Sequence, residues 1–269
     1  MRFALIGYPI DYSLSPFIHQ QFAAQFDVKM DYHLIPTEIE NLSAVIKQLI
    51  SEQYLGINVT QPHKQSILKY VNHQSDTVKK VKAANTIAFR EDEIHAYNTD
   101  GKGFYNAIKY YVGSSLENKN ILLIGAGGVA KSILPELIKL NASTIKLLNR
   151  SVNKSQDLLR QYQGVALYQA NDNYDYIINA TTLAYYQLPV NFPHLEFRDK
   201  IIFDSTYAHQ QSKCQRFMKL YQPEAVYNGV AMLVEQAACA FTIWHGLTPE
   251  IQPVLKNIER YHATLKYSL

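Results

Sequence analysis

The stretch from Ile121 to Ser132, ILLIGAGGVAKS, constrains the fold of this chain more than any other segment. Four apolar residues run straight into a glycine-rich turn, and a helical pattern follows from Val129. A buried strand, a tight turn and a helix N-terminus in this order are typical of a phosphate-binding turn for a dinucleotide. A plain connection between a strand and a helix is the alternative interpretation. The predicted cofactor-binding residues of the turn are Gly125, Ala126, Gly127, Gly128, Val129 and Ala130.

Composition places the chain among globular proteins with a substantial core. Its 269 residues are 47% hydrophobic and 18% charged, enough for one large or two ordinary domains. The net charge is only +3 and no basic run occurs, so we expect no nucleic-acid partner. Cys214 and Cys239 form no C-x-x-C pair and are expected to be buried, unreactive side chains in a reducing compartment. No apolar run is long enough to span a membrane, and we expect a cytoplasmic protein without a membrane partner.

The first hundred residues show the pattern of one α/β layer. Polar residues mark two helix starts, with Ser15 expected as an N-cap before Pro16, and Thr37 to Glu40 expected as a capping box. A hairpin is expected across the charged pair Glu91-Asp92. The expected strands are Arg2–Gly7, Tyr32–Ile35, Leu55–Val59, Thr86–Phe89 and Ile94–Tyr97, with helices at Phe17–Phe26 and up to about Ile50.

A second α/β set follows, after a turn expected at Asn98–Gly103 and a helix at Phe104–Tyr111. Its strands are expected near Ile121–Ile124, Thr144–Leu148, Val165–Tyr168, Tyr176–Asn179, Lys200–Asp204 and Ala225–Tyr227, with helices between most of them. This alternation predicts a parallel sheet covered on both faces. Two final helices, Val230–Trp244 and Pro249 to about Lys266, have no strand left to cross to, so they are expected to pack on the first layer.

The predicted fold is therefore α/β with two domains separated by a cleft. Residues 1–100 with about 230–269 would form a discontinuous substrate-binding and catalytic domain with a mainly parallel sheet. Residues 101–229 would form a Rossmann-like dinucleotide-binding domain.

The end of the second strand of that domain indicates which dinucleotide binds. An NAD site usually carries an acidic residue about 20 residues beyond the glycines, which holds the ribose 2′-hydroxyl. Here Asn149 and Arg150 occupy that place, and Lys154 follows. A guanidinium can donate two hydrogen bonds to a 2′-phosphate, whereas a carboxylate would repel it. We therefore expect NADP; a solvated helix start is the alternative for Arg150 and Lys154.

Polar side chains gather at the expected strand ends of the first half. Ligands in open α/β sheets bind outside the carboxyl ends of the strands, which favours a binding site there. Each residue also has a structural alternative, such as a helix cap for Ser15 or a surface charge for Lys64. The candidates are Ser13, Ser15, Asn58, Thr60, Lys64, Asn85 and Asp100. No acidic pair and no metal-spaced histidine cluster is apparent, no metal is expected, and His63, His95 and His209 are interpreted as structural.

The combination of these motifs resembles the shikimate dehydrogenase family. The matching segments are Ser13–Pro16, Gly56–Lys64, Asn85-Thr86, Asn98–Gly103, Gly125–Gly128, Asn149-Arg150 and Gly229–Gln236. They occur in order along nearly the whole chain. The N-V-T-x-P-x-K segment within 58–64 and the N-T-D-G-x-G segment at 98–103 are specific to this family and its close relatives.

The resemblance implies roles for individual residues. It places Ser13 and Ser15 at the substrate carboxylate, with Tyr207 near that end, and it makes Lys64 and Asp100 the catalytic pair. The substrate set it implies is Ser13, Ser15, Asn58, Thr60, Lys64, Asn85, Asp100, Tyr207 and Gln236. Ala180, Thr181 and Gly229 join the cofactor-binding set. Gln236 lies on an otherwise apolar helix, where its amide needs a partner: a buried bond between helices or a bound polyol.

Three segments depart from the family pattern. Asn179–Tyr186 lacks the usual proline and glycine, His209 replaces a proline, and Lys82 stands where a glycine is common. The first two fall on the cofactor side, where they put cofactor affinity in doubt more than substrate chemistry. The expected activity is the reversible, NADPH-dependent reduction of 3-dehydroshikimate to shikimate by a monomer or homodimer. A broader quinate/shikimate dehydrogenase and a non-catalytic NADP or metabolite sensor are the alternatives.

Overall fold

In the computed structural model the chain divides into two compact units. Residues 1–103 and 234–259 form the first, and residues 104–233 and 260–269 form the second. The structure describes residues 1–113, 116–181, 195–207, 219 and 221–266, apart from the side chains of 152 and 260–266. No helix in this part of the chain is both long enough and apolar enough to cross a membrane.

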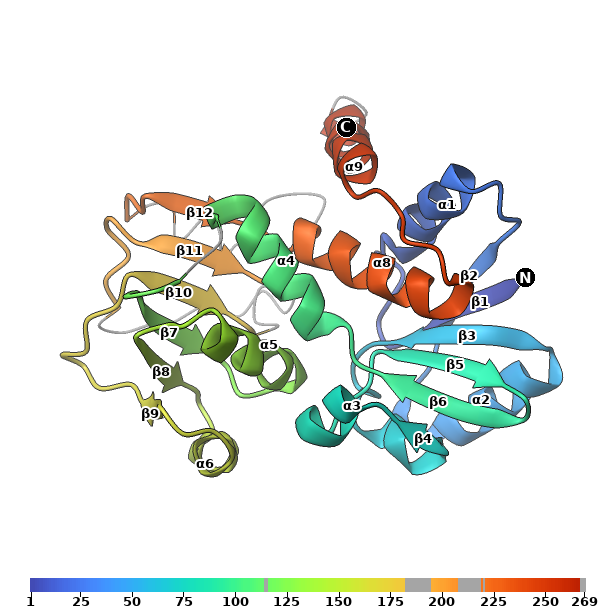
Figure 1. Ribbon diagram of the computed structural model, residues 1–269, viewed down its shortest axis with the longest axis horizontal. Helices are drawn as coiled ribbons and strands as arrows, with labels where there is room; N and C mark the ends of the chain where they lie inside the picture. The colour runs from blue at the N-terminus through green and yellow to red at the C-terminus, as the bar shows by residue number, and fades with distance from the viewer. Residues whose placement is uncertain (114–115, 182–194, 208–218, 220, 267–269) are drawn as a thin grey trace. The chain divides into compact units, whose positions relative to one another are not determined.

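The first unit is built on a six-stranded mixed sheet (Figure 1). Its strands are β1 (Arg2–Gly7), β2 (Asp31–Pro36), β3 (Tyr54–Val59), β4 (His73–Gln74), β5 (Thr86–Arg90) and β6 (Glu93–Tyr97). The spatial order is β2-β1-β3-β5-β6-β4. β1 pairs in parallel with β2 and β3, and β4 with β6, whereas β5 is antiparallel to both of its neighbours. The predicted hairpin across Glu91-Asp92 is confirmed, and both turn residues have positive φ.

Successive side chains of a strand point to opposite faces of its sheet, so the two faces of the first sheet carry separate apolar clusters. Phe3 and Leu5 of β1 pack into one apolar cluster, while Ala4 and Ile6 pack into another with Leu42. Helices and 3₁₀ turns on this unit are α1 (Ser15–Gln25), η1 (Ile39–Asn41), α2 (Leu42–Ser51), η2 (Ser66–Tyr70) and α3 (Asp76–Val81). This burial on both faces explains why β1 is a nearly continuous apolar run in the sequence.

The two predicted helix caps do not form. Helix α1 begins at Ser15 itself, after Leu14 at the N-cap, and Pro16 lies in the first turn. Thr37 precedes the N-cap residues of η1 and α2, which are Glu38 and Asn41 and make no side-chain cap. Its hydroxyl donates to the carbonyl of Ile35 at 2.8 Å. Both hydroxyls instead bond back towards the preceding loop or strand, an alternative open to any Ser or Thr near a helix start.

The chain returns to the first unit through α8 (Val230–His245), which is followed by α9 (Gln252–Lys266). The indole N–H of Trp244 donates to the carbonyl of Ile87 at 2.9 Å, and its ring lies 4.7 Å from that of Phe3. A Cβ at Gly56 would overlap the indole nitrogen and lie 2.8 Å from the Ile87 carbonyl oxygen. The glycine on β3 therefore makes room for the tryptophan, and the expected packing of α8 on the first layer is observed.

The second unit contains a six-stranded, all-parallel sheet (Figure 1). The strands are β7 (Asn120–Ile124), β8 (Thr144–Leu148), β9 (Val165–Leu167), β10 (Tyr176–Asn179), β11 (Ile201–Asp204) and β12 (Ala225–Tyr227). Their order is β12-β11-β10-β7-β8-β9, so the strand order reverses between β7 and β10. In doubly wound sheets this reversal is the place where dinucleotides bind. The parallel α/β arrangement predicted from the sequence is confirmed.

The described helices of the second unit include α4 (Asp100–Val112), which enters this unit at Phe104, α5 (Gly128–Lys139) and α6 (Val152–Gln161). Phe104 and Tyr111 of α4 pack on the rings of Phe203 and Tyr227 at 5.3 and 4.5 Å. The turn predicted at Asn98–Gly103 is wrong in its second half, because α4 already begins at Asp100. The amide of Gly103 donates to the carbonyl of Thr99 at 2.9 Å, which closes the first helical turn despite two glycines.

Candidate functional site

The polar candidates of the first unit lie at one edge of its sheet. β1, β3 and β6 run in the same direction, and β5 runs the opposite way. The register pairs Asn58 with Thr86 and Thr86 with Tyr97. The carboxyl ends of β3 and β6 therefore meet the amino end of β5. Thr60 and Lys64 follow β3, Asn85 precedes β5, and Asp100 follows β6 at this same edge.

Lys64 and Asp100 form an ion pair at this edge. Lys64 Nζ lies 2.7 Å from Asp100 Oδ2, and the two side chains are 18% and 6% exposed. Asp100 occupies the first turn of α4, where the positive end of the helix dipole favours a carboxylate. The other carboxylate oxygen, Oδ1, accepts a hydrogen bond of 2.9 Å from Asn85 Nδ2. These two residues, which the family resemblance pairs in catalysis, are in direct contact.

Asn85 links three parts of the chain. Its buried amide nitrogen lies within hydrogen-bonding distance of Asp100 Oδ1, Thr99 Oγ1 and Gln236 Oε1, at 2.9, 2.8 and 3.0 Å. Its side-chain oxygen Oδ1 accepts from the backbone amide of Thr99 at 2.8 Å. Gln236 Oε1 therefore accepts a hydrogen bond from a side chain at the sheet edge, and the contact of Gln236 with a bound polyol stays a prediction. Asn85 thereby ties α8 to the Lys64–Asp100 pair.

Asn58 is buried and fully occupied by protein groups. Its Oδ1 accepts from the Tyr32 hydroxyl at 2.7 Å and lies 3.2 Å from His19 Nε2. Its Nδ2 donates to the Asn85 carbonyl and to Thr86 Oγ1, both at 3.2 Å. A side-chain amide has two donors and two acceptor sites, so no capacity is left for a ligand. Asn58 fits the role of holding Asn85 in place better than the direct substrate contact that we predicted.

The remaining first-unit candidates lie in the loops after β1 and β3. Ser13 and Ser15 are adjacent, with their hydroxyl oxygens 3.1 Å apart, and Ser15 is buried. Thr60 is half-buried, and its amide donates to the carbonyl of Ile6 at 2.9 Å. A Cβ at Gly7 would overlap Thr60 Cγ2, so glycine at this position lets the two loops approach each other.

The glycine turn of the second unit has the geometry of a phosphate cradle. Gly125 has φ 111°, and its amide donates to the Leu148 carbonyl at 2.8 Å. Gly127 is the N-cap of α5, offers no side-chain cap, and is exposed; a Cβ there would meet no protein atom within 4 Å. Ala130 is fully buried against the sheet. The open space over Gly127 and the uncapped amides of α5 fit an incoming pyrophosphate.

The other cofactor-side candidates lie on strand ends beside this turn. Leu148 is paired with Ile124, so Asn149 follows β8 opposite Gly125. Asn149 Nδ2 donates to the Ser151 carbonyl at 2.8 Å, and the side chains of Arg150 and Lys154 are exposed. On the other side, Ala180 and Thr181 follow β10, and the Ala180 amide donates to the Ile124 carbonyl at 2.8 Å. Gly128 and Val129, half-buried, open α5.

Gly229 and Lys82 have local structural explanations. A Cβ at Gly229 would overlap the Ser205 carbonyl oxygen, so close backbone packing already requires glycine there. Lys82 adopts the left-handed conformation, with φ 55°, at the end of α3. That conformation suits glycine, which explains why a family pattern would carry one. Tyr207 is half-buried, while 182–186 and His209 lie outside the described residues, as does Cys214.

The structure bears on two further expectations, one about a cysteine and one about the histidines. Burial raises the pKa of Cys239 to about 11, in keeping with the expected unreactive thiol. The expectation that no histidine cluster has metal-ligand spacing is wrong: His73, Glu93 and His95 bring their ligand atoms within 4.8 Å of one another. His95 does not stand alone, because strand pairing brings His73 beside it. The only signal in the sequence is Glu93-x-His95 on one strand, which places two ligands on one face.

Comparisons with known proteins agree with this architecture. Residues 5–87 match the model of the shikimate dehydrogenase substrate binding domain, 108–186 that of shikimate / quinate 5-dehydrogenase, and 229–259 that of the shikimate 5′-dehydrogenase C-terminal domain. The chain is 32% identical to the shikimate dehydrogenase (NADP⁺) of Aeromonas salmonicida, over 98% of this chain and 99% of that protein.

Solved structures give the same result. One shikimate dehydrogenase in complex with NADP⁺ is 31% identical with a TM-score of 0.83, covering 96% of this chain and 93% of that one. The enzyme from Thermus thermophilus in complex with NADP(H) and shikimate is 26% identical with a TM-score of 0.84, covering 97% and 99%. The two-unit α/β fold, the three family models and the full-length relatives together show that the chain belongs to the family of NADP-dependent shikimate dehydrogenases.

Proposed function

We propose that the chain catalyses the reversible, NADPH-dependent reduction of 3-dehydroshikimate to shikimate, a step in the biosynthesis of chorismate and the aromatic amino acids. The observation that carries this proposal is the Lys64–Asp100 pair, 2.7 Å apart at a sheet edge lined by hydroxyl and amide side chains. Membership of the NADP-dependent shikimate dehydrogenase family supports it. A polyol carboxylate is the kind of ligand that such a polar edge suits.

Lys64 has the chemistry needed to handle the proton. Reduction of a ketone builds negative charge on its oxygen, so a positioned proton donor lowers the barrier. When bound, NADPH supplies the hydride. Lys64 Nζ gives a proton to the forming hydroxyl, and in the alcohol-oxidising direction the same nitrogen accepts it. Asp100 positions Lys64 through the 2.7 Å contact and can accept a hydrogen bond from a substrate hydroxyl.

The substrate contacts follow from which polar groups line the edge. Ser13 and Ser15 present two adjacent hydroxyls that can donate to a carboxylate. Thr60, Asp100 and Gln236 supply donors and acceptors for ring hydroxyls. The side-chain amide of Asn85 is bonded within the protein, and its direct contact with the substrate stays a prediction. Asn58 acts on the substrate indirectly, through Asn85. Tyr207 belongs to the second unit, and its contact with the substrate carboxylate stays a prediction.

The cofactor contacts are assigned to the switch point of the second sheet. The amides of Gly125–Gly128 and the start of α5, with Val129 and the buried Ala130, suit the pyrophosphate. Arg150, shortly after β8, and Lys154, in the first turn of α6, are exposed and can reach a 2′-phosphate, with Asn149 beside Arg150. Ala180, Thr181 and Gly229 complete the proposed set.

The experiment is a steady-state assay with shikimate and NADP⁺, following nicotinamide absorbance, on the unmutated chain and on Lys64→Ala. Removal of the proton acceptor should lower kcat by roughly 10²- to 10⁴-fold with little change in KM. Lys79→Ala is the matched control, since Lys79 is an exposed lysine of α3 paired only loosely with Asp76 at 3.5 Å. A near-normal kcat in Lys64→Ala would remove Lys64 from the mechanism, and an inactive unmutated chain would favour a sensor.

Quinate is a second candidate substrate, because one matching family model is described as shikimate / quinate 5-dehydrogenase. Quinate carries one more hydroxyl than shikimate and lacks the ring double bond. Comparison of kcat/KM for the two acids, with NADP⁺ and NAD⁺ in turn, decides both substrate and cofactor preference. A cytoplasmic location and a monomeric or homodimeric state stay predictions.

A further inference from the structure

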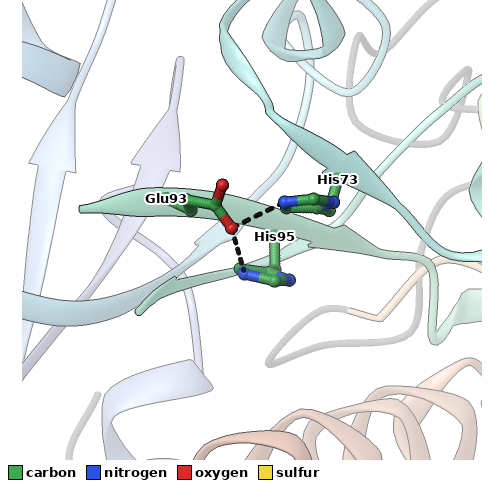
Figure 2. Close-up of side chains that lie close together, drawn as sticks. All are labelled: His73, Glu93 and His95. Carbon is green, nitrogen blue, oxygen red and sulfur yellow. Dashed lines mark hydrogen bonds and ion pairs between the residues drawn. The ribbon is translucent and has the colours of Figure 1, made fainter. Parts of the chain in front are cut away.

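Three potential metal ligands converge on the edge of the first sheet, at residues that the proposed reaction does not use. Figure 2 shows the side chains of His73, Glu93 and His95 directed toward one another. His73 Nε2 lies 2.6 Å from Glu93 Oε2, and His95 Nε2 lies 3.7 Å from the same oxygen. One ligand atom from each residue lies within 4.8 Å of the other two.

The backbone places these ligands through strand pairing. β4 is the edge strand, and His73 is the register partner of His95 on β6. Glu93 precedes His95 by two residues on β6, so both side chains point to the same face of the sheet. The Asn72 and Ser75 amides donate to the Ile94 and Ala96 carbonyls at 2.9 and 3.0 Å, which holds β4 in place. The ligand positions therefore do not depend on a free loop.

The spacing suits a single ion. Metal–ligand bonds of about 2.0–2.2 Å in a tetrahedral site require neighbouring ligand atoms roughly 3.3–3.6 Å apart. The two measured distances of 2.6 and 3.7 Å lie on either side of that range, so small side-chain rotations suffice. The imidazole rings are stacked, with centroids 4.6 Å apart and planes at 23°, and both Nε2 atoms face the same carboxylate oxygen, Glu93 Oε2.

An ion pair alone gives a weaker account of this cluster. The side chains of His73 and Glu93 are 53% and 51% exposed, and a surface pair of that kind contributes little to stability. It also gives no reason for a second histidine to face the same carboxylate oxygen. Two imidazoles and one carboxylate form a ligand set for borderline transition metals, with the remaining coordination positions open to water.

We propose that His73, Glu93 and His95 bind one divalent transition-metal ion of the Zn²⁺ class at the β4–β6 edge of the first sheet. The ion ties the two-residue strand β4 to β6. β4 lies in the middle of the segment between Lys64 and Asn85, which also contains η2 and α3. The site is therefore structural: it fixes the segment that joins two residues of the candidate active site. It stands independently of the proposed reaction.

Titration calorimetry with Zn²⁺ tests the proposal. The protein is the whole chain, from which a chelator has first removed any bound metal. The unmutated chain should bind Zn²⁺ at this site, and His73→Gln, Glu93→Gln and His95→Gln should each weaken that binding at least tenfold. His33→Gln is the matched control, because His33 is an exposed strand histidine outside the cluster. The side chains of three further histidines, at 194, 209 and 262, are not among those described. Weaker Zn²⁺ binding in the three cluster variants is therefore the result that assigns the bound ion to this site.

A second readout separates the site from misfolding of a variant. Co²⁺ in the unmutated chain should give visible d–d absorption, and Zn²⁺ should raise Tm; both effects should disappear in His73→Gln and His95→Gln while their metal-free Tm stays unchanged. Absence of saturable binding in the unmutated chain would overturn the proposal. Equal Zn²⁺ affinity in the unmutated chain and the three cluster variants would overturn it as well.

Discussion

Buried His19 predicts how the stability of the first unit responds to acid. Its ring is fully buried and stacks on the ring of Tyr32, with the centroids 4.6 Å apart. The distance from His19 Nε2 to Asn58 Oδ1 is 3.2 Å. Within the described part of the chain Nδ1 has no hydrogen-bond partner. Burial lowers the pKa of His19 to about 3, although the hydrogen bond to Asn58 opposes the shift, and nearby His245 lowers the pKa slightly further.

The sign of the effect follows from which state binds the proton. Between pH 6.5 and about 3 the unfolded chain holds a proton on His19 and the folded chain does not, so the free energy of unfolding falls as the pH falls. The full lowering of the His19 pKa, from 6.5 to about 3, corresponds to about 5 kcal/mol in the free energy of unfolding. From pH 7 to pH 5 the loss amounts to about 2 kcal/mol. Burial also lowers the pKa of His245, which acts in the same direction.

The assay is urea unfolding at a series of pH values, followed by the fluorescence of Trp244. Trp244 is the only tryptophan, and its ring lies 5.2 Å from that of His19, so it reports on this unit. His19→Gln should keep a donor to Asn58 but flatten the decline between pH 7 and 5 by about 2 kcal/mol. His33→Gln should leave the decline intact. If the unmutated chain and His19→Gln lose the same stability over this range, the argument from burial is refuted.

Two further substitutions test other parts of the structure. Arg150→Ala should raise the KM for NADP⁺ far more than the KM for NAD⁺, because only NADP⁺ carries a 2′-phosphate. The shikimate assay that follows nicotinamide absorbance measures both values. Equal changes in KM for the two cofactors would contradict the role of Arg150. Gly56→Ala should lower the free energy of unfolding by about 2–4 kcal/mol, because the new Cβ overlaps the Trp244 indole and breaks its 2.9 Å bond to Ile87. Gly127→Ala, with open space around its Cβ, should leave the urea midpoint unchanged, and an equal loss in both variants would contradict the packing argument.

Strands were predictable from the sequence because their signal is local. Ile121–Ile124 and Thr144–Leu148 are short apolar runs bounded by polar or glycine residues, and the observed strands begin and end within one residue of them. The cofactor turn was equally readable, since the tight turn and the helix start depend on consecutive residues. The family resemblance came from such local motifs as well.

Helix starts and side-chain partners were less predictable. Asp100 lies between polar and glycine residues that favour a turn, yet the Gly103 amide bonds to the Thr99 carbonyl and α4 begins at Asp100. Whether a serine or threonine caps a helix depends on small differences between competing hydrogen bonds, so Ser15 and Thr37 were assigned wrongly. The full occupation of Asn58 depends on Tyr32, Asn85 and Thr86, which are distant in sequence. The pairing of His73 with His95 likewise requires knowledge of strand register.

The return of the chain to its first unit at Val234 has a consequence for synthesis on the ribosome. The Asn85 amide that bonds Gln236 is made 151 residues before its partner, and Gly56, which leaves room for Trp244, is made earlier still. While residues 104–233 are being translated, the nascent first sheet lacks the helix that covers its Phe3 and Gly56 surface. That interval exposes apolar surface to chaperones and to other nascent chains, and it ends only when the last helices leave the exit tunnel.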